Sequence, residues 1–167
     1  MKKIVIMLAV IAMVMGMLAG CGEKTAISIK DIDWSVAEGI ADGQRLVGFK
    51  YTNNSAYTIT YLQIRMRPKQ GVTKDDFASF DYEEWMGDDY EAEDIFMDGI
   101  CDNAVNPGET SKGGWFGRNN IFYVRNIDEY KNVEPDMMTI RYADENGDEH
   151  TMYYDYHAHK YFEDSAE

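Results

Sequence analysis

Two alternating segments near the C-terminus constrain the fold most strongly. Residues 138–142 and 150–154 each carry apolar or aromatic side chains at every second position, which is the period of a half-buried β-strand. They flank Glu145-Asn146-Gly147, a sequence typical of a tight turn. The pattern therefore predicts an antiparallel hairpin with one buried face.

The length of the loop decides which side chains share that face. A two-residue Asn-Gly turn would place Ile140 opposite Tyr153, whereas a three-residue loop with a left-handed Gly147 places Ile140 opposite Met152. Only the three-residue loop collects the apolar side chains on one face, so we predict that register. It leaves four polar side chains on the solvent face: Thr139, Arg141, Thr151 and Asp155.

Similar alternation predicts strands further upstream. In the segment 57–67 the apolar positions are Leu62, Ile64 and Met66, and the polar positions are Gln63, Arg65 and Arg67. Residues 25–36 change the parity of their apolar side chains, which we interpret as a β-bulge near Lys30-Asp31. Further strands are expected at 47–51, 110–116 and 121–124, with a short irregular or helical piece at 127–133. About seven strands with one inserted helix predict a mainly β chain, folded as a small antiparallel β-sandwich.

The inserted helix is predicted at about 73–86. Thr73 can cap a helix with Asp76 as its partner three residues on, and Val72 and Phe77 stand where a hydrophobic staple places them. Phe77 and Phe80 would then form the buried stripe. The segment Asp88–Asp98 follows with six acids and no base, and we interpret it as a solvated loop rather than a cation site.

The N-terminus carries a different kind of signal. Lys2-Lys3 precedes the apolar run Ile4–Leu18, and Leu18-Ala19-Gly20-Cys21 closes it. Fifteen helical residues span about 22 Å, which is short of the roughly 30 Å that a bilayer core requires, so a transmembrane helix is disfavoured. The segment resembles bacterial lipoprotein signal peptides. That resemblance implies cleavage between Gly20 and Cys21 and a lipid on the Cys21 thiol.

We therefore expect the chain to divide into a signal peptide over 1–20, which forms a helix, a lipidated tether over 21–24, a single domain over 25–162 and a tail over 163–167. The expected location is the extracytoplasmic face of the cell membrane, with the lipid on Cys21 as the membrane contact.

Charge and cysteine content exclude several functions. The chain carries a net charge of −14, and the predicted leader contributes only lysines, so the mature part is more acidic still. Such a chain lacks the cationic footprint of a nucleic-acid-binding protein. Only Cys101 remains once Cys21 carries lipid, so no intramolecular disulfide can form. We expect Cys101 to be a small buried hydrophobe with a raised pKa rather than a nucleophile.

Two segments resemble a known class of domain. The run Phe49–Ser55 followed by Tyr57–Leu62, together with Asn106-Pro107-Gly108, resembles the immunoglobulin-like, FxLYD-type domains of small bacterial lipoproteins. The C-terminal segment Glu134–Tyr142 resembles uncharacterised lipoproteins of Gram-positive anaerobes. The resemblance implies an immunoglobulin-like sandwich at the cell envelope and supplies no catalytic residues.

Candidate site residues are few. Asp155, His157 and His159 alternate, so on an extended strand they would share one face, and two histidines at that spacing can bind zinc. No third ligand faces them in the predicted register, so we assign no metal there. The twelve tyrosines and three tryptophans, beside many acids, could form a sugar-binding platform, although most aromatics in a small sandwich belong to the core.

No acid–base pair, activated nucleophile or cofactor motif is visible, so we do not expect an enzyme or a cofactor. The sequence favours a non-catalytic binding or adaptor domain at the envelope, with an envelope protein or a cell-wall component as its partner. The alternative is a lipoprotein that captures a sugar, a peptide or a cation. Neither the oligomeric state nor the ligand follows from the sequence.

Overall fold

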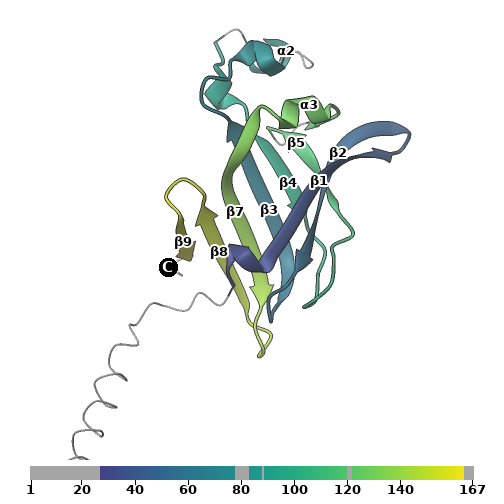
Figure 1. Ribbon diagram of the computed structural model, residues 1–167, viewed down its shortest axis with the longest axis vertical. Coiled ribbons are helices and arrows are strands. Elements are labelled where there is room, and N and C mark those ends of the chain that lie inside the picture. Colours follow the sequence, from purple (N-terminus) through teal and green to yellow (C-terminus); the bar gives the residue numbers. More distant parts are fainter. Residues whose placement is uncertain (1–26, 78–82, 88, 120–121, 164–167) are drawn as a thin grey trace, which may run out of the picture.

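The computed structural model describes residues 27–77, 83–87, 89–119 and 122–163, which form a mainly β, antiparallel domain (Figure 1). Its nine strands are β1 (Ile32–Ala41), β2 (Gln44–Asn53), β3 (Thr58–Pro68), β4 (Met97–Cys101), β5 (Gly114–Arg118), β6 (Phe122–Tyr123), β7 (Val133–Ala143), β8 (Glu149–Asp155) and β9 (Lys160–Glu163). The helical segments are short: the 3-10 turns η1 (Ile29–Asp31), η2 (Lys74–Phe77) and η3 (Ala92–Asp94), and the helices α2 (Glu83–Met86) and α3 (Ile127–Tyr130).

The predicted fold class, mainly β and antiparallel, is confirmed. The strands share one hydrogen-bonded sheet in the order β1-β2-β5-β4-β3-β7-β8-β9, with β6 paired to β5. A layered core arises because this sheet folds over itself, so that β1 crosses in front of the central strands (Figure 1). Its two edges approach each other where the Ile29 backbone N–H donates to the Tyr161 hydroxyl at 3.0 Å.

The core lies on the inner face of the folded sheet. Strand pairing places one inward row across it, formed by Tyr154, Met138, Ile64, Gly99 and Phe116. The apolar members of this row are all buried. The alternation predicted for β3 is confirmed, because its apolar positions point into this core while the polar positions between them face outward.

The C-terminal hairpin has the predicted register. Ile140 lies opposite Met152 and Tyr142 opposite His150. Gly147 has a φ of 86°, in the left-handed region that the three-residue loop requires. The Asp144 carboxylate accepts hydrogen bonds from the backbone N–H groups of Asn146 and Asp148, which holds the loop.

Two predicted boundaries are wrong. The parity change near Lys30 comes from the 3-10 turn η1, capped by Ser28, and not from a β-bulge. The strand predicted at 110–116 begins only at Gly114, and Thr110 forms a single isolated bridge to Thr52. A bulge and a one-turn helix shift the alternation in the same way, so the sequence pattern did not separate them.

The described residues of the predicted inserted helix are η2 at its start and α2 at its end, and residues 78–82 lie outside the described residues. The turn η2 begins at Lys74, directly after Thr73, whose backbone N–H donates to the Asp76 carboxylate at 2.8 Å. Phe77 is fully buried, as predicted, whereas Phe80 lies outside the described residues. The predicted signal helix and Cys21 also lie outside them.

A buried ion pair joins the sheet to α3. The Arg118 Nε donates to the Glu129 carboxylate at 2.7 Å, and the Arg118 Nη2 contacts the same oxygen. The two side chains are only 4% and 3% exposed. Burial raises the pKa of the Glu129 carboxyl, and Arg118 opposes that shift.

Candidate ligand-binding groove

The outer face of the sheet, which points away from the core, carries aromatic and polar side chains. Because successive side chains on a strand point to opposite faces, paired residues on neighbouring strands form rows across the sheet. One outward row runs through Phe162, Tyr153, Thr139, Gln63, Ile100, Trp115, Gly48 and Ala37. The candidate site lies across the middle of this row.

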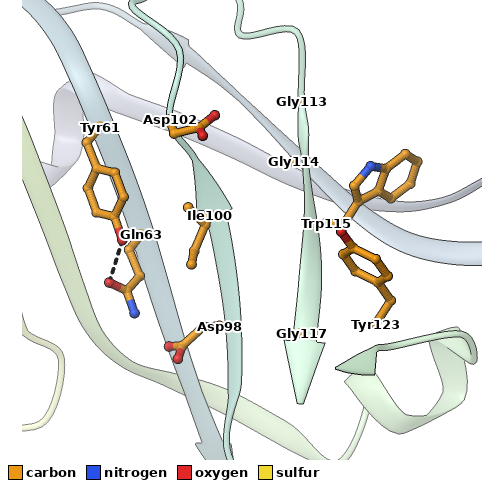
Figure 2. Close-up of a pocket in the computed structure, with 10 residues that line it drawn as sticks. All are labelled: Tyr61, Gln63, Asp98, Ile100, Asp102, Gly113, Gly114, Trp115, Gly117 and Tyr123. Atoms are coloured by element: carbon orange, nitrogen blue, oxygen red, sulfur yellow. Dashed lines mark hydrogen bonds between the residues drawn. The ribbon is translucent and has the colours of Figure 1, made fainter. Parts of the chain in front are cut away.

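A groove of about 650 Å³ crosses β3, β4 and β5 on this face. Figure 2 shows Tyr61 at one side, Trp115 and Tyr123 at the other, and Ile100 of β4 between them. The polar lining residues are Gln63, Asp98 and Asp102, and three glycines complete the β5 side, at positions 113, 114 and 117. The volume falls in the range of small-molecule sites, and the mixture of aromatic and polar groups is typical of them.

The Trp115 ring lies over two glycines, Gly39 and Gly48, which we call the glycine seat. A Cβ at Gly48 would lie 2.9 Å from the six-membered ring of the indole, and a Cβ at Gly39 would lie 3.0 Å from it. The distance at Gly48 is closer than carbon atoms approach one another, and the distance at Gly39 would require the ring to shift by a few tenths of an ångström. The absence of two side chains therefore fixes where this indole lies. Beyond it, the β1–β2 hairpin and β5 border a second hollow of about 480 Å³.

The Asp98 carboxylate at the floor of the groove is fully engaged. Its two oxygens accept hydrogen bonds from the Nε and Nη2 of Arg65, each at 2.9 Å. Asp98 is 1% exposed, and the Arg65 guanidinium also lies 4.5 Å from the centre of the Phe96 ring. The hydrogen bond to Asp98 raises the pKa of Arg65. This bidentate pair is structural, and it holds both charges in place beneath the groove.

The Tyr61 side chain is held on two sides. Its hydroxyl donates to the Gln63 Oε1 at 2.9 Å, and the Arg141 guanidinium lies 4.8 Å from the centre of its ring. Burial raises the pKa of Tyr61, so the hydroxyl stays protonated at neutral pH. Gln63 lines the groove, and this hydrogen bond uses its amide oxygen and leaves its N–H groups as donors (Figure 2).

Four charged side chains act on the Tyr61 hydroxyl. Arg141 and Arg65 lower its pKa, whereas Asp98 and Asp102 raise it. Of these four, only the two acids line the groove, and Arg65 neutralises Asp98. Asp102 is exposed at the end of the groove and offers its carboxylate oxygens as acceptors (Figure 2). The arrangement can contact a ring and can donate and accept hydrogen bonds, with Asp102 as the one charge of the described lining that Arg65 does not neutralise.

The residues predicted as a weak metal site do not share a strand face. β8 ends at Asp155, and His157 and His159 lie in the turn before β9. The Asp155 carboxylate accepts hydrogen bonds from the backbone N–H groups of His157 and Ala158, which builds that turn. These residues therefore do not form the extended strand that a shared face would require, because the Asp155 side chain caps a reversal of the chain.

The two histidines then face different partners. The His157 Nδ1 lies 2.8 Å from the Arg67 Nη2, and its Nε2 lies 3.3 Å from the Asp136 carboxylate. The His159 Nδ1 lies 3.3 Å from the Tyr154 hydroxyl. Within the described ranges, no group of three or more His, Cys, Asp or Glu side chains is arranged to hold a metal ion.

The acidic segment 88–98 was predicted as one solvated loop, and its last part is not. Residues 97–101 form β4, a central strand of the sheet, and Asp98 is buried against Arg65. The acids at 89–94 are exposed, and the Asp94 carboxylate caps η3 by accepting from the Glu91 backbone N–H. Asp88 lies outside the described residues.

Cys101 is buried on the inner face of β4, as predicted. Its sulfur lies 3.7 Å from the Ser111 hydroxyl oxygen, and burial raises the pKa of its thiol. A protonated, buried thiol is a poor nucleophile, so Cys101 belongs to the core and not to the groove.

Comparisons with other proteins add no identity. No protein-family model matches the sequence. No curated protein and no solved structure matches it either. The helices in the described part of the chain are all too short, or too polar, to cross a membrane.

Proposed function

We propose that the chain is a non-catalytic binding domain, held at the extracytoplasmic face of the cell membrane by a lipid on Cys21. The groove across β3, β4 and β5 is its binding surface. The observation that carries this proposal is the placement of Tyr61, Trp115 and Tyr123 around a groove on the solvent side of the sheet. Exposed aromatic side chains that converge on one concave surface are typical of binding sites.

The chemistry of the lining supports binding rather than catalysis. Asp98 is neutralised by Arg65, and the Tyr61 hydroxyl is protonated and hydrogen-bonded to Gln63. General acid–base catalysis needs a titratable group with a pKa near neutral that can reach the substrate. The remaining acid of the lining, Asp102, stands alone at the solvent edge.

The shape favours the adaptor function over the capture of a free solute. Sites that sequester small molecules enclose most of the ligand surface. This groove lies open along the face of the sheet and continues past Trp115 toward the second hollow. A long ligand that remains attached to the envelope fits such a surface better than a small solute does.

Two variants test the proposal. Cys21→Ser should move the protein from the membrane fraction to the soluble fraction, as shown by immunoblotting after fractionation. The full chain should sediment with envelope material from the producing cells. Trp115→Ala should weaken that sedimentation at least tenfold, whereas Phe162→Ala, which removes a half-exposed aromatic from the far edge of the same face, should not.

Membrane association of Cys21→Ser at the wild-type level would contradict the anchor. Equal sedimentation of the Trp115→Ala and Phe162→Ala variants would contradict the assignment of the groove.

A further inference from the structure

We infer that the groove binds a neutral glycan, a chain of uncharged pyranose rings. This inference rests on the proposed function, because it names the ligand of the same groove. Three properties of the described residues carry it: the neutralised charge beneath the groove, the position of the aromatic rings and the free hydrogen-bonding groups.

The first property is the neutralised charge beneath the groove. The charged side chains of the lining are Asp98 and Asp102, and Arg65, which lies outside the lining, pairs with Asp98. An ionic ligand would need an opposite charge that is not already paired, and Asp98 is bound by both arms of Arg65. Asp102 is exposed, and an exposed ion pair contributes only about 0–1 kcal/mol. The lining therefore favours an uncharged ligand.

The second property is the spacing of the rings. Tyr61 on β3 and Trp115 on β5 stand on either side of β4, about 10 Å apart at the backbone because neighbouring strands are separated by about 4.8 Å. Ile100 and the backbone of Gly114 and Gly117 form a low floor between them. The Trp115 ring itself lies over Gly48 and Gly39, beyond β5, so the aromatic surface extends along the groove from Tyr61 to Trp115 and Tyr123. Successive sugar rings along this surface can place their C–H groups, which carry partial positive charge, against the negative faces of the aromatic rings.

The third property is the pair of free polar groups. The amide N–H groups of Gln63 are donors, and the carboxylate of Asp102 is an acceptor. Sugar hydroxyls both donate and accept, so they satisfy both groups at once. The half-buried Gln63 amide discriminates against ligands that leave it unpaired, whereas the exposed Asp102 can remain hydrated.

A peptide ligand fits less well. Peptides that bind sheets usually add a strand at a free edge, through main-chain hydrogen bonds. The groove crosses β4, which is hydrogen-bonded on both sides, to β3 and to β5. Its backbone groups are therefore already used, and recognition must come from side chains alone.

The direct test is titration of the full chain, purified in a polyoxyethylene ether detergent that carries no sugar headgroup. The probes are three neutral hexasaccharides (cellohexaose, maltohexaose and hexa-N-acetylchitohexaose), cationic chitosan hexamer, anionic hexagalacturonate and hexalysine. We expect at least one neutral hexamer to bind with a Kd below about 1 mM by isothermal titration calorimetry. Its affinity should fall at least tenfold in Trp115→Ala and stay within twofold in Phe162→Ala.

Gly39→Ala provides a second variant, which substitutes no residue that lines the groove. Its added methyl would stand 3.0 Å from the Trp115 ring, so the indole must move. We expect this variant also to weaken binding of the neutral hexamer. Circular dichroism spectra of both variants should match the wild type, which checks that the fold is retained.

The inference is overturned if none of the neutral hexamers binds below 1 mM, if a charged probe binds tenfold more tightly than all of them, or if binding survives in Trp115→Ala. A second experiment, sedimentation with envelope material, separates this inference from the proposed function. Periodate cleaves vicinal diols, which glucose chains contain and internal 1,4-linked N-acetylglucosamine residues lack. If cellohexaose or maltohexaose is the neutral hexamer that binds, periodate-treated envelope material should no longer sediment the chain.

Trp115-dependent sedimentation that survives periodate, together with loss of binding after protease digestion of the envelope, would indicate a protein ligand. That result would overturn the glycan and leave the proposed binding function standing. Binding of a neutral hexamer without sedimentation on the envelope would overturn the proposed function and leave the glycan site standing.

Discussion

The buried ion pair between Arg118 and Glu129 allows a quantitative test of how this fold is held together. The perturbation is removal of each charge alone and of both together, with the variants Arg118→Met, Glu129→Met and the double variant. At an effective dielectric constant of about 20, unit charges about 4 Å apart attract by about 4 kcal/mol. Desolvation of each buried charge costs several kcal/mol, so the attraction roughly offsets that cost.

Removing one partner leaves the other charge desolvated and without its counter-ion. Each single variant should therefore lose about 3–5 kcal/mol of the free energy of unfolding. The double variant removes both desolvation costs and should lie within about 1–2 kcal/mol of the wild type, or above it. The two effects should thus be strongly non-additive, as expected for residues in direct contact.

Urea-induced unfolding, followed by far-UV circular dichroism, measures these free energies, and each kcal/mol should also shift Tm by about 2–4 °C. Lys131→Met is the matched control, because it removes a cation of α3's exposed pair with Asp128, whose side chains are 70% and 68% exposed. It should cost less than about 1 kcal/mol. A double variant that loses the sum of the two single losses would refute this reasoning, because the two charges would then act independently.

Two further predictions concern the C-terminal hairpin and its neighbours. Gly147→Val should lower the free energy of unfolding, measured in urea, by about 1–2 kcal/mol or more. Gly147 has a φ of 86° and nothing lies within 4 Å of its missing Cβ, so the cost is that of the backbone alone. An unchanged unfolding midpoint would contradict the left-handed loop. Burial raises the pKa of Tyr156 to about 12, so the unfolded chain releases this proton at a lower pH than the folded chain does, and stability should fall as pH rises from about 10 toward 12. The slope of unfolding free energy against pH over that range should be shallower in Tyr156→Phe, and equal slopes would contradict the assignment.

The parts of this fold that could be predicted from sequence are those fixed by local patterns. The register around Gly147 followed from loop length and alternation, and both are properties of some twenty consecutive residues. The strand β4 could not be predicted in this way. Asp98 and Gly99 interrupt its apolar pattern, and the carboxylate is tolerated only because Arg65, far away in the sequence, neutralises it.

The groove was hidden for the same reason. Tyr61, Ile100 and Trp115 come from three strands that the sheet brings together, and the composition indicated only that aromatic residues were abundant. The turn at Asp155 shows that a local pattern can also mislead. Asp155, His157 and His159 alternate as residues of a strand do, but hydrogen bonds to the Asp155 side chain reverse the chain there. Alternation alone does not separate a strand from a turn that follows one.

The glycine seat under Trp115 has a consequence for how such sequences diverge. The volume of the Trp115 ring constrains Gly39 and Gly48, since a methyl group at either glycine would lie within 3.0 Å of the ring. Related chains should therefore change Gly39 and Trp115 together, because a small residue at 115 frees position 39 to acquire a side chain. Gly48 stays restricted even then, because its Cβ would also lie 3.0 Å from the Gly114 carbonyl oxygen. The walls of the groove at Tyr61 and Tyr123 carry no such restriction, so new ligand preferences should evolve at the walls while the seat stays constant.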